Sequence, residues 1–368
     1  MLTSPLAPYL LWAKSRHPAP IDLAGSNLVH CDFDDLPGAR EGLELWIPND
    51  NGYPPLVEAL ASHYGVAANR VATAAGCSGA NFVAIAALVG AGDDVLIEQP
   101  TYDPLIGACR LMGASVRRFG RRFESGFAVD VDDIRAAVTD RTKLIILTSP
   151  HNPSGIPFDR TTLVAIGEIA DRVGAQVLVD QVYLDAANAI RSPHDRWIAA
   201  AELDGPFLTT SSLTKSYGLA GLRCGWTVAP AAVAERLRRT RDVVDNAGSA
   251  PAERLGALAL SHKHHLIARA KALLATNVDR MRHFLADHPA LDVASTPAAS
   301  VTFPRIKGVA DAGPFVTRLL EHHGVAVAPG AFFDAPAHFR ISLAGRSDTL
   351  EKGLAKLSEA LRMHASGS

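Results

Sequence analysis

Residues 144–180 read LIILTSPHNPSGIPFDRTTLVAIGEIADRVGAQVLVD, a stretch in which two short apolar runs flank a segment of helical periodicity. The runs at 144–148 and 176–180 are continuous and rich in β-branched residues, which is typical of strands buried on both faces. The segment at 160–173 between them has the spacing of an amphipathic helix. This stretch therefore predicts two parallel strands joined by a helix.

The same alternation continues on both sides of this stretch. Further continuous apolar runs lie at 95–99, 207–211 and 226–229, and further helical patterns lie at 81–89, 104–112 and 132–138. Strands that alternate with helices in this way favour a sheet covered by helices on both faces. We therefore predict an α/β fold with a large domain built on a mostly parallel sheet wrapped by helices.

The pattern changes after residue 230. Helical segments follow at 231–241 and 251–288, then strand candidates at 300–306, 325–328 and 338–343, and a final helix at 349–363. The first 45 residues are Pro-rich and too short to form a core, so we expect them to fold onto the C-terminal part or onto a neighbouring chain. The predicted organisation is an N-terminal arm with part of a small domain at 1–45, a large domain at 46–270 and a small α+β domain at 271–368.

Composition and charge exclude several classes of protein. With 36 basic and 38 acidic residues in 368, the chain gives no electrostatic reason to bind nucleic acid or a membrane surface. No apolar run approaches the roughly 20 residues of a membrane helix. The N-terminal stretch carries its basic residues after the apolar part, the wrong order for a secretory signal. The four cysteines are far apart and form no CxxC pair. We therefore expect a globular protein of the cytoplasm.

Polar side chains that could take part in a reaction follow the predicted strands. In open parallel sheets, functional groups gather at the carboxyl ends of the strands. The residues found there are Tyr102, Asn152, Asp180, Tyr183 and Lys215. They would bring an aromatic ring, an amide, a carboxylate, a phenol and an amine to one crevice.

A metal site is not expected. Histidines lie at 262, 264 and 265, and on a helix positions 262 and 265 would share a face, but no carboxylate or thiolate completes a ligand set. They are better explained as part of a solvated basic face. No Ser–His–Asp ordering emerges either.

Three motifs carry a resemblance to a known family. SPHNPSG at 149–155 is similar to the family's NPHNPTG, and DQVY at 180–183 is similar to its D-x-x-Y. SSLTKSYGLAGLRCGW at 211–226 is similar to its S-x-x-K-x-x-G-L-x-G-x-R-x-G-W. With these motifs in family order and spacing, the chain resembles the class I/II aminotransferases, which are fold-type I pyridoxal-phosphate enzymes, over nearly its whole length. The resemblance implies a seven-stranded type of sheet and pyridoxal 5′-phosphate as cofactor, bound in the large domain.

The resemblance assigns catalytic roles to residues at the strand ends. Lys215 would form the Schiff base with the cofactor and, once freed, move a proton, because desolvation lowers the pKa of a lysine and exposes a nucleophilic amine. Asp180 would keep the ring nitrogen protonated, as an electron-withdrawing cofactor requires. Asn152 and Tyr183 would hydrogen-bond its 3-oxygen, and Tyr102 would stack on its ring.

Other residues would hold the phosphate and the substrate. Cys77, Ser78 and Gly79 precede the predicted helix at 81–89, whose N-terminus would bind the phosphate, and the matches to the family's other phosphate contacts are Ser212 and Arg223. Arg340 resembles the arginine that grips the substrate's α-carboxylate, since a planar guanidinium can bind it through two hydrogen bonds. Gly25 and Asn152 would lie near the same carboxylate.

The sequence departs from the family pattern at two positions. Many members place a tyrosine, which reaches the phosphate of the partner subunit, five residues before the glycine of G-x-P-x-L; here that slot holds Ile47. Tyr53 is a possible substitute, although its position does not match. Where members acting on dicarboxylic acids carry an arginine, the approximate match is Asp245, and a carboxylate there would repel acidic side chains and favour basic or neutral amino acids.

The leading hypothesis is an aminotransferase that moves an α-amino group between an L-amino acid and a 2-oxo acid with ping-pong kinetics. A lyase, decarboxylase or cyclase on the same fold uses the same cofactor-binding residues and stays open. A non-catalytic effector-sensing domain would need an added DNA-binding module, and a nicotinamide-dependent oxidoreductase would need a glycine fingerprint after the first strand. The resemblance also implies a homodimer, with the apolar N-terminal stretch as one contact.

Overall fold

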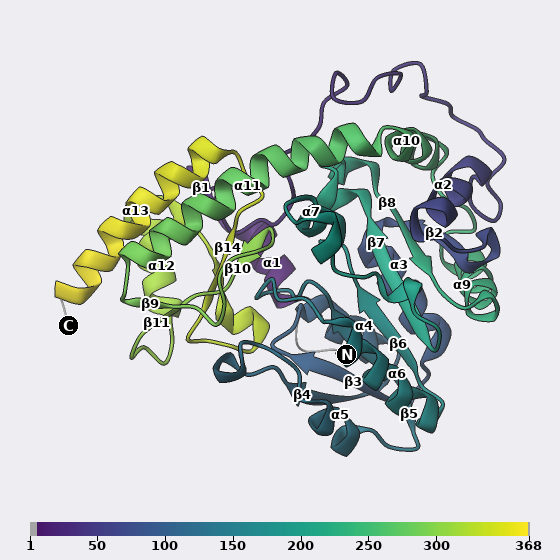
Figure 1. Cartoon of the computed structure of the whole chain (residues 1–368), viewed down its shortest axis with the longest axis horizontal. Helices are drawn as coiled ribbons and strands as arrows, with labels where there is room; N and C mark the ends of the chain where they lie inside the picture. Colours follow the sequence, from purple (N-terminus) through teal and green to yellow (C-terminus); the bar gives the residue numbers. More distant parts are fainter. Residues whose placement is uncertain (1–5, 367–368) are drawn as a thin grey trace.

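The computed structural model describes residues 6–366 and has a large part and a small part (Figure 1). The large part is built on a seven-stranded sheet of order β2-β8-β7-β6-β5-β3-β4, in which only β8 runs antiparallel to its neighbours. The predicted α/β class and the mostly parallel sheet are confirmed. Its strands are β2 (Val71–Ala75), β3 (Asp94–Gln99), β4 (Ser115–Gly120), β5 (Thr142–Thr148), β6 (Gln176–Asp180), β7 (Phe207–Ser212) and β8 (Cys224–Val228).

Helices cover both faces of this sheet. They are α2 (Pro54–Tyr64), α3 (Gly76–Leu88), α4 (Asp103–Leu111), α5 (Val131–Ala137), α6 (Arg160–Val173), α7 (Leu184–Ala189), α8 (Leu213–Ser216), α9 (Ala231–Val244) and α10 (Ala250–Ser261). Along β3, Val95 and Ile97 pack with α3 and α4, whereas Leu96 between them packs with α5 and α6 on the other face. Because successive side chains point to opposite faces, burial on both sides requires the continuous apolar runs seen in the sequence.

The small part combines the two ends of the chain. Its elements are α1 (Pro8–Ser15), β1 (Ile21–Asp22), α11 (Lys263–Asp287), β9 (Leu291–Asp292), β10 (Val301–Thr302), β11 (Arg305–Ile306), α12 (Gly313–His323), β12 (Val325–Ala326), β13 (Ala328–Pro329), β14 (Phe339–Ser342) and α13 (Ser347–Ser366). β1 pairs with β12 in parallel, and β14 lies between β10 and β13. The expectation that the N-terminal segment folds onto the C-terminal part is therefore confirmed for β1. Residues 1–5 of the predicted arm lie outside the described residues.

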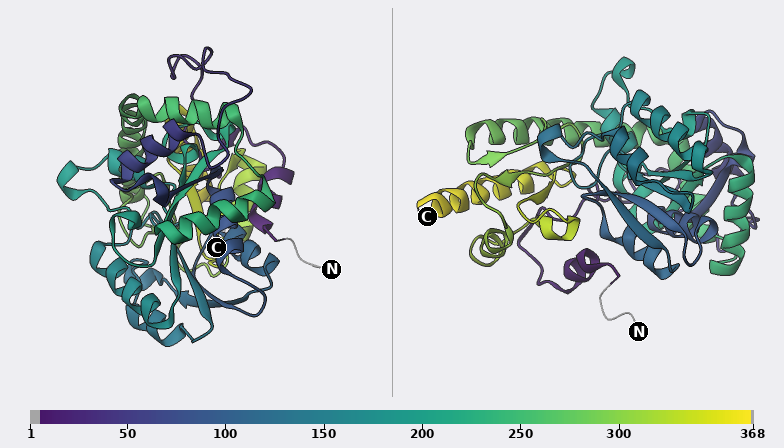
Figure 2. Two further views of the ribbon diagram at one scale, coloured as in Figure 1. Left: turned by 90° about the vertical axis from the view of Figure 1, so that its right-hand side faces the viewer. Right: turned by 90° about the horizontal axis from the view of Figure 1, so that it is seen from below.

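Two features connect the large and small parts. α11 is a single helix of 25 residues that continues through position 270, the predicted boundary, and bridges the two parts along the top of Figure 1. The helical stretch predicted at 251–288 is thus divided at His262 into α10 and α11. α1 lies against the C-terminal part (Figure 2), where Tyr9 packs with Phe303 and Phe333. The domain division at 45 and 270 stays a prediction.

Candidate active site

A cavity of about 720 Å³ lies where the C-terminal ends of β5, β6 and β7 face the small part. Its size is typical of a site for a small molecule. Its lining brings together three regions of the chain: the N-terminal segment, the ends of the large sheet, and β14. Among the lining residues are Tyr9, Gly25, Ser26, Cys77, Ser78, Tyr102, Asn152, Asp180, Tyr183, Ser212, Lys215, Arg223 and Arg340.

Lys215 lies in α8, the short helix that follows β7 directly, so the sheet edge fixes its position. Its Nζ donates to Oγ of Ser26 at 3.0 Å and to Oδ1 of Asn27 at 2.6 Å. Desolvation in the cavity, followed by the positive charge of Arg340, lowers the pKa of Lys215 to about 7. A substantial fraction of this amine is therefore neutral and nucleophilic near neutral pH.

Asp180 ends β6 and is 8% exposed. Its Oδ2 accepts from Nδ2 of Asn81 at 2.7 Å, and its Oδ1 accepts from the backbone N–H of Val182 at 3.2 Å and from Sγ of Cys77 at 3.4 Å. Thr210 donates to Oδ1 of Asn81 at 2.6 Å, which fixes the orientation of that amide. Burial raises the pKa of Asp180, while these hydrogen bonds favour its charged form. The result is a carboxylate in the lining of the cavity that is held in one orientation.

Arg340 on β14 is 1% exposed and has only neutral hydrogen-bond acceptors. Its Nη1 donates to Oδ1 of Asn152 at 2.6 Å, and its Nη2 donates to the hydroxyl of Tyr9 and to the carbonyl of Ala24, both at 2.8 Å. Because a guanidinium can only donate, the oxygen of the Asn152 amide must face it. A buried cation without an anionic partner among these contacts favours the binding of an anion.

The two tyrosines predicted from the sequence both line the cavity. The hydroxyl of Tyr183 donates to Oγ of Ser26 at 2.9 Å, so Ser26 receives hydrogen bonds from both Tyr183 and Lys215. Burial raises the pKa of Tyr183 to about 12, so the phenol is neutral and can donate. Tyr102 precedes α4 and makes an edge-to-face contact with Tyr9 at a centroid distance of 6.2 Å. Its stacking role stays a prediction.

The predicted phosphate end of the cavity combines a helix start with a cation. α3 begins at Gly76 directly after β2, so Cys77, Ser78 and Gly79 form its first turn. At Gly76, φ is +74°, and a Cβ there would lie 2.4 Å from Nη2 of Arg223. Ser212 precedes α8 and also lines the cavity. First-turn N–H groups beside a guanidinium are the donors that a phosphate group prefers.

Several residues of this site were not predicted from the sequence. They are Tyr9, Ser26, Asn27, Asn81 and Thr148, all of which line the cavity. One of them left a signal: Asn81 is a polar residue within an otherwise apolar helix, four positions after Cys77 and so on the same side. Ser26 and Asn27 follow the predicted Gly25, but nothing in their local pattern indicates that they face a lysine 188 or 189 residues away.

The residues singled out as departures lie outside this cavity. Asp245 follows α9 and forms an ion pair with Arg241, so within this chain its carboxylate faces an arginine and not the cavity. Its role in specificity stays a prediction. Ile47 is 4% exposed, and Tyr53 precedes α2 with its backbone N–H bonded to Glu253. Among the described residues no group of His, Cys, Asp or Glu could hold a metal ion.

The donor set of the cavity fits pyridoxal 5′-phosphate. The cradle of Gly76 and Arg223 suits a phosphate, the oriented carboxylate of Asp180 suits a protonated ring nitrogen, and Lys215 lines the same cavity. The fold and the site together define a pyridoxal-phosphate-dependent enzyme.

The family model described as aminotransferase class I and II matches residues 43–357, so the chain belongs to this family. It is 33% identical to the capreomycidine synthase of Streptomyces vinaceus over 99% of this chain and 95% of that protein. A PLP-dependent aminotransferase from Streptococcus suis superposes with a TM-score of 0.90, at 27% identity over 99% of both chains. The PLP-dependent cyclase OrfR superposes with a TM-score of 0.87, at 26% identity over 99% of this chain and 98% of that one. Within residues 6–366, every helix is too short or too polar to span a membrane.

Proposed function

We propose that this chain is an aminotransferase that moves an α-amino group between an L-amino acid and a 2-oxo acid by a ping-pong mechanism. The observation that carries the proposal is the placement of Lys215 and Arg340 in one cavity: a lysine whose pKa is lowered to about 7 and a buried guanidinium with only neutral acceptors. An amine that gains and loses protons near neutral pH can serve as both base and acid. The guanidinium would hold the α-carboxylate of either substrate.

When bound, pyridoxal 5′-phosphate supplies an aldehyde that takes up the amino group and a ring that withdraws electrons from the α-carbon. Asp180 would hold a proton on the ring nitrogen, while Cys77, Ser78, Gly79, Ser212 and Arg223 would hold the phosphate. Nδ2 of Asn152, left free by the orientation of its amide toward Arg340, and the hydroxyl of Tyr183 would donate to the 3-oxygen. Tyr102 would cover the ring.

Proton transfer at the substrate falls to Lys215. Its Nζ would take the proton from the α-carbon of the substrate and pass it to C4′ of the cofactor, the carbon that receives the amino group. Ser26 and Asn27 accept hydrogen bonds from this amine and would limit its movement between the two positions. Arg340 and Gly25 would hold the carboxylate so that the bond to be broken faces Lys215.

A second reaction deserves a test because two of the matched proteins point to it. The capreomycidine synthase of Streptomyces vinaceus and the cyclase OrfR both match nearly the whole chain. A cyclase, lyase or decarboxylase on this fold would use Lys215, Asp180 and Arg340 in the same way for the first proton transfer or bond cleavage. Such an enzyme differs from an aminotransferase in the fate of the amino group. The amino group does not remain on the cofactor but leaves the enzyme together with the product.

One experiment separates the two reactions. The holoenzyme is mixed with single L-amino acids in the absence of any 2-oxo acid, and the cofactor absorbance is recorded. An aminotransferase converts the cofactor to its amine form and stops until a 2-oxo acid is added. Return of the aldehyde absorbance without an acceptor contradicts amino transfer and supports a lyase or cyclase. A panel that includes aspartate and arginine also tests the predicted preference linked to Asp245, and Lys215→Ala serves as the inactive control.

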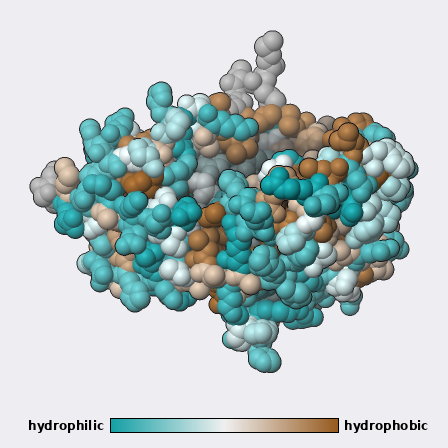
Figure 3. Space-filling model, turned by 90° about the horizontal axis from the view of Figure 1, so that it is seen from above, coloured by the Kyte–Doolittle hydropathy of each residue, from teal (hydrophilic) through white to brown (hydrophobic). Residues whose placement is uncertain are grey.

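We also propose that the chain forms a homodimer. The segment before α2 exposes Leu43, Leu45 and Trp46, the latter two at 93% and 78%. This segment lies at the top of Figure 1. Figure 3 views the molecule from that side and shows hydrophobic areas on this face. Ser78 and Arg223 at the phosphate end are also exposed, so a second subunit could cover that end.

The assembly is tested by light scattering. Leu45→Glu should yield monomers with weaker cofactor retention, whereas Met363→Glu, at a methionine 67% exposed on α13, should not. A wild-type protein that is monomeric at micromolar concentration contradicts the proposal.

The four cysteines are all free thiols, which supports a reducing compartment such as the cytoplasm.

A further inference from the structure

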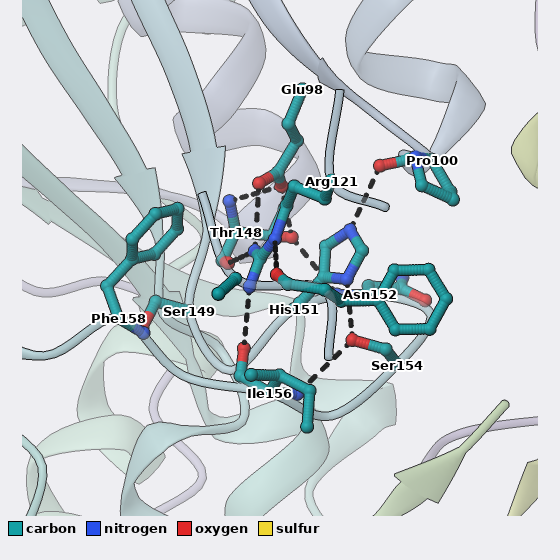
Figure 4. Close-up of polar contacts among 12 residues, drawn as sticks. Glu98, Pro100, Arg121, Thr148, Ser149, His151, Asn152, Ser154, Ile156 and Phe158 are labelled. Atoms are coloured by element: carbon teal, nitrogen blue, oxygen red, sulfur yellow. Dashed lines mark hydrogen bonds and ion pairs between the residues drawn. The ribbon is translucent and has the colours of Figure 1, made fainter. Parts of the chain in front are cut away.

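Behind the cavity, a fully buried ion pair joins Glu98 at the end of β3 to Arg121 just after β4 (Figure 4). Nη1 of Arg121 lies 3.0 Å from Oε2 of Glu98, and the side chains are 1% and 0% exposed. The remaining donors of Arg121 reach backbone carbonyls: Nε donates to Phe127 at 2.6 Å, and Nη2 donates to Ile156 at 3.3 Å. The guanidinium therefore ties two loops of the large part to the end of β3.

The second oxygen of Glu98 holds Thr148, the last residue of β5. Oε1 accepts from the backbone N–H of Thr148 at 2.6 Å and from its hydroxyl at 2.5 Å. Because the hydroxyl proton is directed at the carboxylate, its oxygen is left to accept from elsewhere. It does so from the backbone N–H of Asn152 at 3.0 Å (Figure 4). The charge of Glu98 thus sets the direction of the hydrogen bonds up to Asn152.

Asn152 completes the connection to the substrate side of the cavity. Its Oδ1 accepts from Nη1 of Arg340 at 2.6 Å. Glu98, Thr148, Asn152 and Arg340 are each at most 7% exposed, so water does not compete strongly for these bonds. The backbone position of Asn152 decides whether its oxygen reaches the guanidinium while its nitrogen is free for the cavity.

We propose that the Glu98–Arg121 pair is a positioning device for the carboxylate-binding arginine, acting through Thr148 and Asn152. This inference rests on the role given to Arg340 and Asn152 under the proposed function. Burying two charges is expensive, and a buried ion pair is weak evidence for a gain in stability alone. Here the pair holds in place the turn that carries Asn152. Glu98 and Arg121 do not line the cavity, so they are positioning residues and not catalytic ones.

The chain offers matched variants for a test. Glu98→Gln keeps the shape but turns an amide donor toward Arg121 or Thr148, and Thr148→Val removes the hydroxyl at nearly constant volume. Thr148→Ser restores the hydroxyl. Asp94→Asn is the control: Asp94 begins the same strand, its side chain is 1% exposed, it pairs with Arg141 and accepts from Thr139, and it lies away from the cavity.

The primary readout is the pH titration of the bound cofactor's absorbance, with Asn152→Ala as reference. Losing a donor to the 3-oxygen should raise the titration midpoint in that reference. Glu98→Gln and Thr148→Val should reproduce at least half of the shift, and Thr148→Ser and Asp94→Asn should stay at the wild-type value. Glu98→Gln and Thr148→Val should also raise KM about tenfold for the amino acid that proves to be a substrate, while kcat changes less.

The outcomes separate this inference from the proposed function. If Asn152→Ala shifts the midpoint but Glu98→Gln and Thr148→Val do not, the positioning role is wrong and the assigned site stands. If Asp94→Asn shifts the midpoint as much as Glu98→Gln, the pair acts only through general stability and the inference is also wrong. If Asn152→Ala has no effect, the cofactor contact itself fails and the inference with it. Thermal unfolding of each variant identifies any that do not fold. If Glu98→Gln does not fold, Thr148→Val alone tests the inference.

Discussion

Nη1 of Arg340 donates to Oδ1 of Asn152 at 2.6 Å, although 188 residues separate the two along the chain. Arg340 belongs to a strand of the small part, and Asn152 follows a strand of the large sheet. The contact therefore exists only when both parts are folded and in place. It joins two of the residues that resemblance to the family assigns to the substrate, and it leaves Nδ2 of Asn152 free for the cavity.

The hydroxyl of Tyr9 should strengthen substrate binding through Arg340. In Tyr9→Phe, Nη2 of Arg340 keeps only the carbonyl of Ala24 as an acceptor. A hydrogen bond to a charged group contributes about 1.5–3 kcal/mol, so we expect KM for the amino acid to rise about tenfold or more. Steady-state kinetics with the active amino acid measure the change.

Tyr64→Phe is the matched control for this variant. Tyr64 is also a buried tyrosine, and its hydroxyl accepts from Nε1 of Trp226 outside the cavity. Its loss should cost about 1 kcal/mol of unfolding free energy and leave KM unchanged. Equal changes in KM for the two variants would show that Tyr9 acts only through stability.

Asn81 should set the acid limit of activity. Burial already raises the pKa of Asp180, and the hydrogen bond from Asn81 opposes that effect. Removing the donor in Asn81→Ala raises the pKa further, so Asp180 becomes protonated at a higher pH. We expect the acid limb of the pH profile of kcat to move upward by about one pH unit. In Asn277→Ala, which removes a buried amide of α11 bonded to two carbonyls, the limb should not move.

Gly76 should be essential for the phosphate end of the site. In Gly76→Ala, the new Cβ would lie 2.4 Å from Nη2 of Arg223 and would also occupy a residue with a φ of +74°. We expect the dissociation constant for pyridoxal 5′-phosphate to rise at least about tenfold because the guanidinium must move. Gly65→Ala has a similar φ of +65° but nothing within 4 Å of the added carbon. It should lose about 1 kcal/mol of stability and keep the wild-type affinity for the cofactor.

Lys215 should govern the pH dependence of cofactor uptake. Its pKa is lowered from 10.5 to about 7, so in the folded, cofactor-free protein the amine becomes neutral near pH 7. The rate of Schiff-base formation with pyridoxal 5′-phosphate should therefore rise with pH and level off above about pH 8. Stopped-flow absorbance measures this rate. A rate that keeps rising up to pH 10 would show that the amine is not desolvated.

The same shift has a consequence for stability. The unfolded chain holds a proton on Lys215 up to about pH 10.5, whereas the folded chain releases it near pH 7. The unfolded state thus binds more protons between these values, so this group makes the folded state more stable as pH rises through that window. In cofactor-free Lys215→Met, that contribution to the slope of unfolding free energy against pH should disappear. Urea denaturation at several pH values measures it.

The strands that were predicted and those that were missed differ in a physical way. β5 and β6 are buried on both faces and read as unbroken apolar runs. β4 is an edge strand with alternating exposure and two arginines, so its sequence SVRRFG carries no such run. β2 consists mostly of alanine, which has little strand preference of its own, and it is held by pairing with β8. Such strands depend on their neighbours more than on their own residues.

The α/β class, the strands at the centre of the sheet and the candidate residues of the site could all be predicted from the sequence alone. Apolar runs, helical spacing and the motifs around Asn152, Asp180 and Lys215 are local properties that can be read along the chain. The partners of these residues could not be predicted locally and appear only in the folded chain: Tyr9 and Asn152 at Arg340, Ser26 at Lys215, and Asn81 at Asp180. These contacts join segments far apart in the chain, and they form because the packing of the small part against the large sheet fixes the distances.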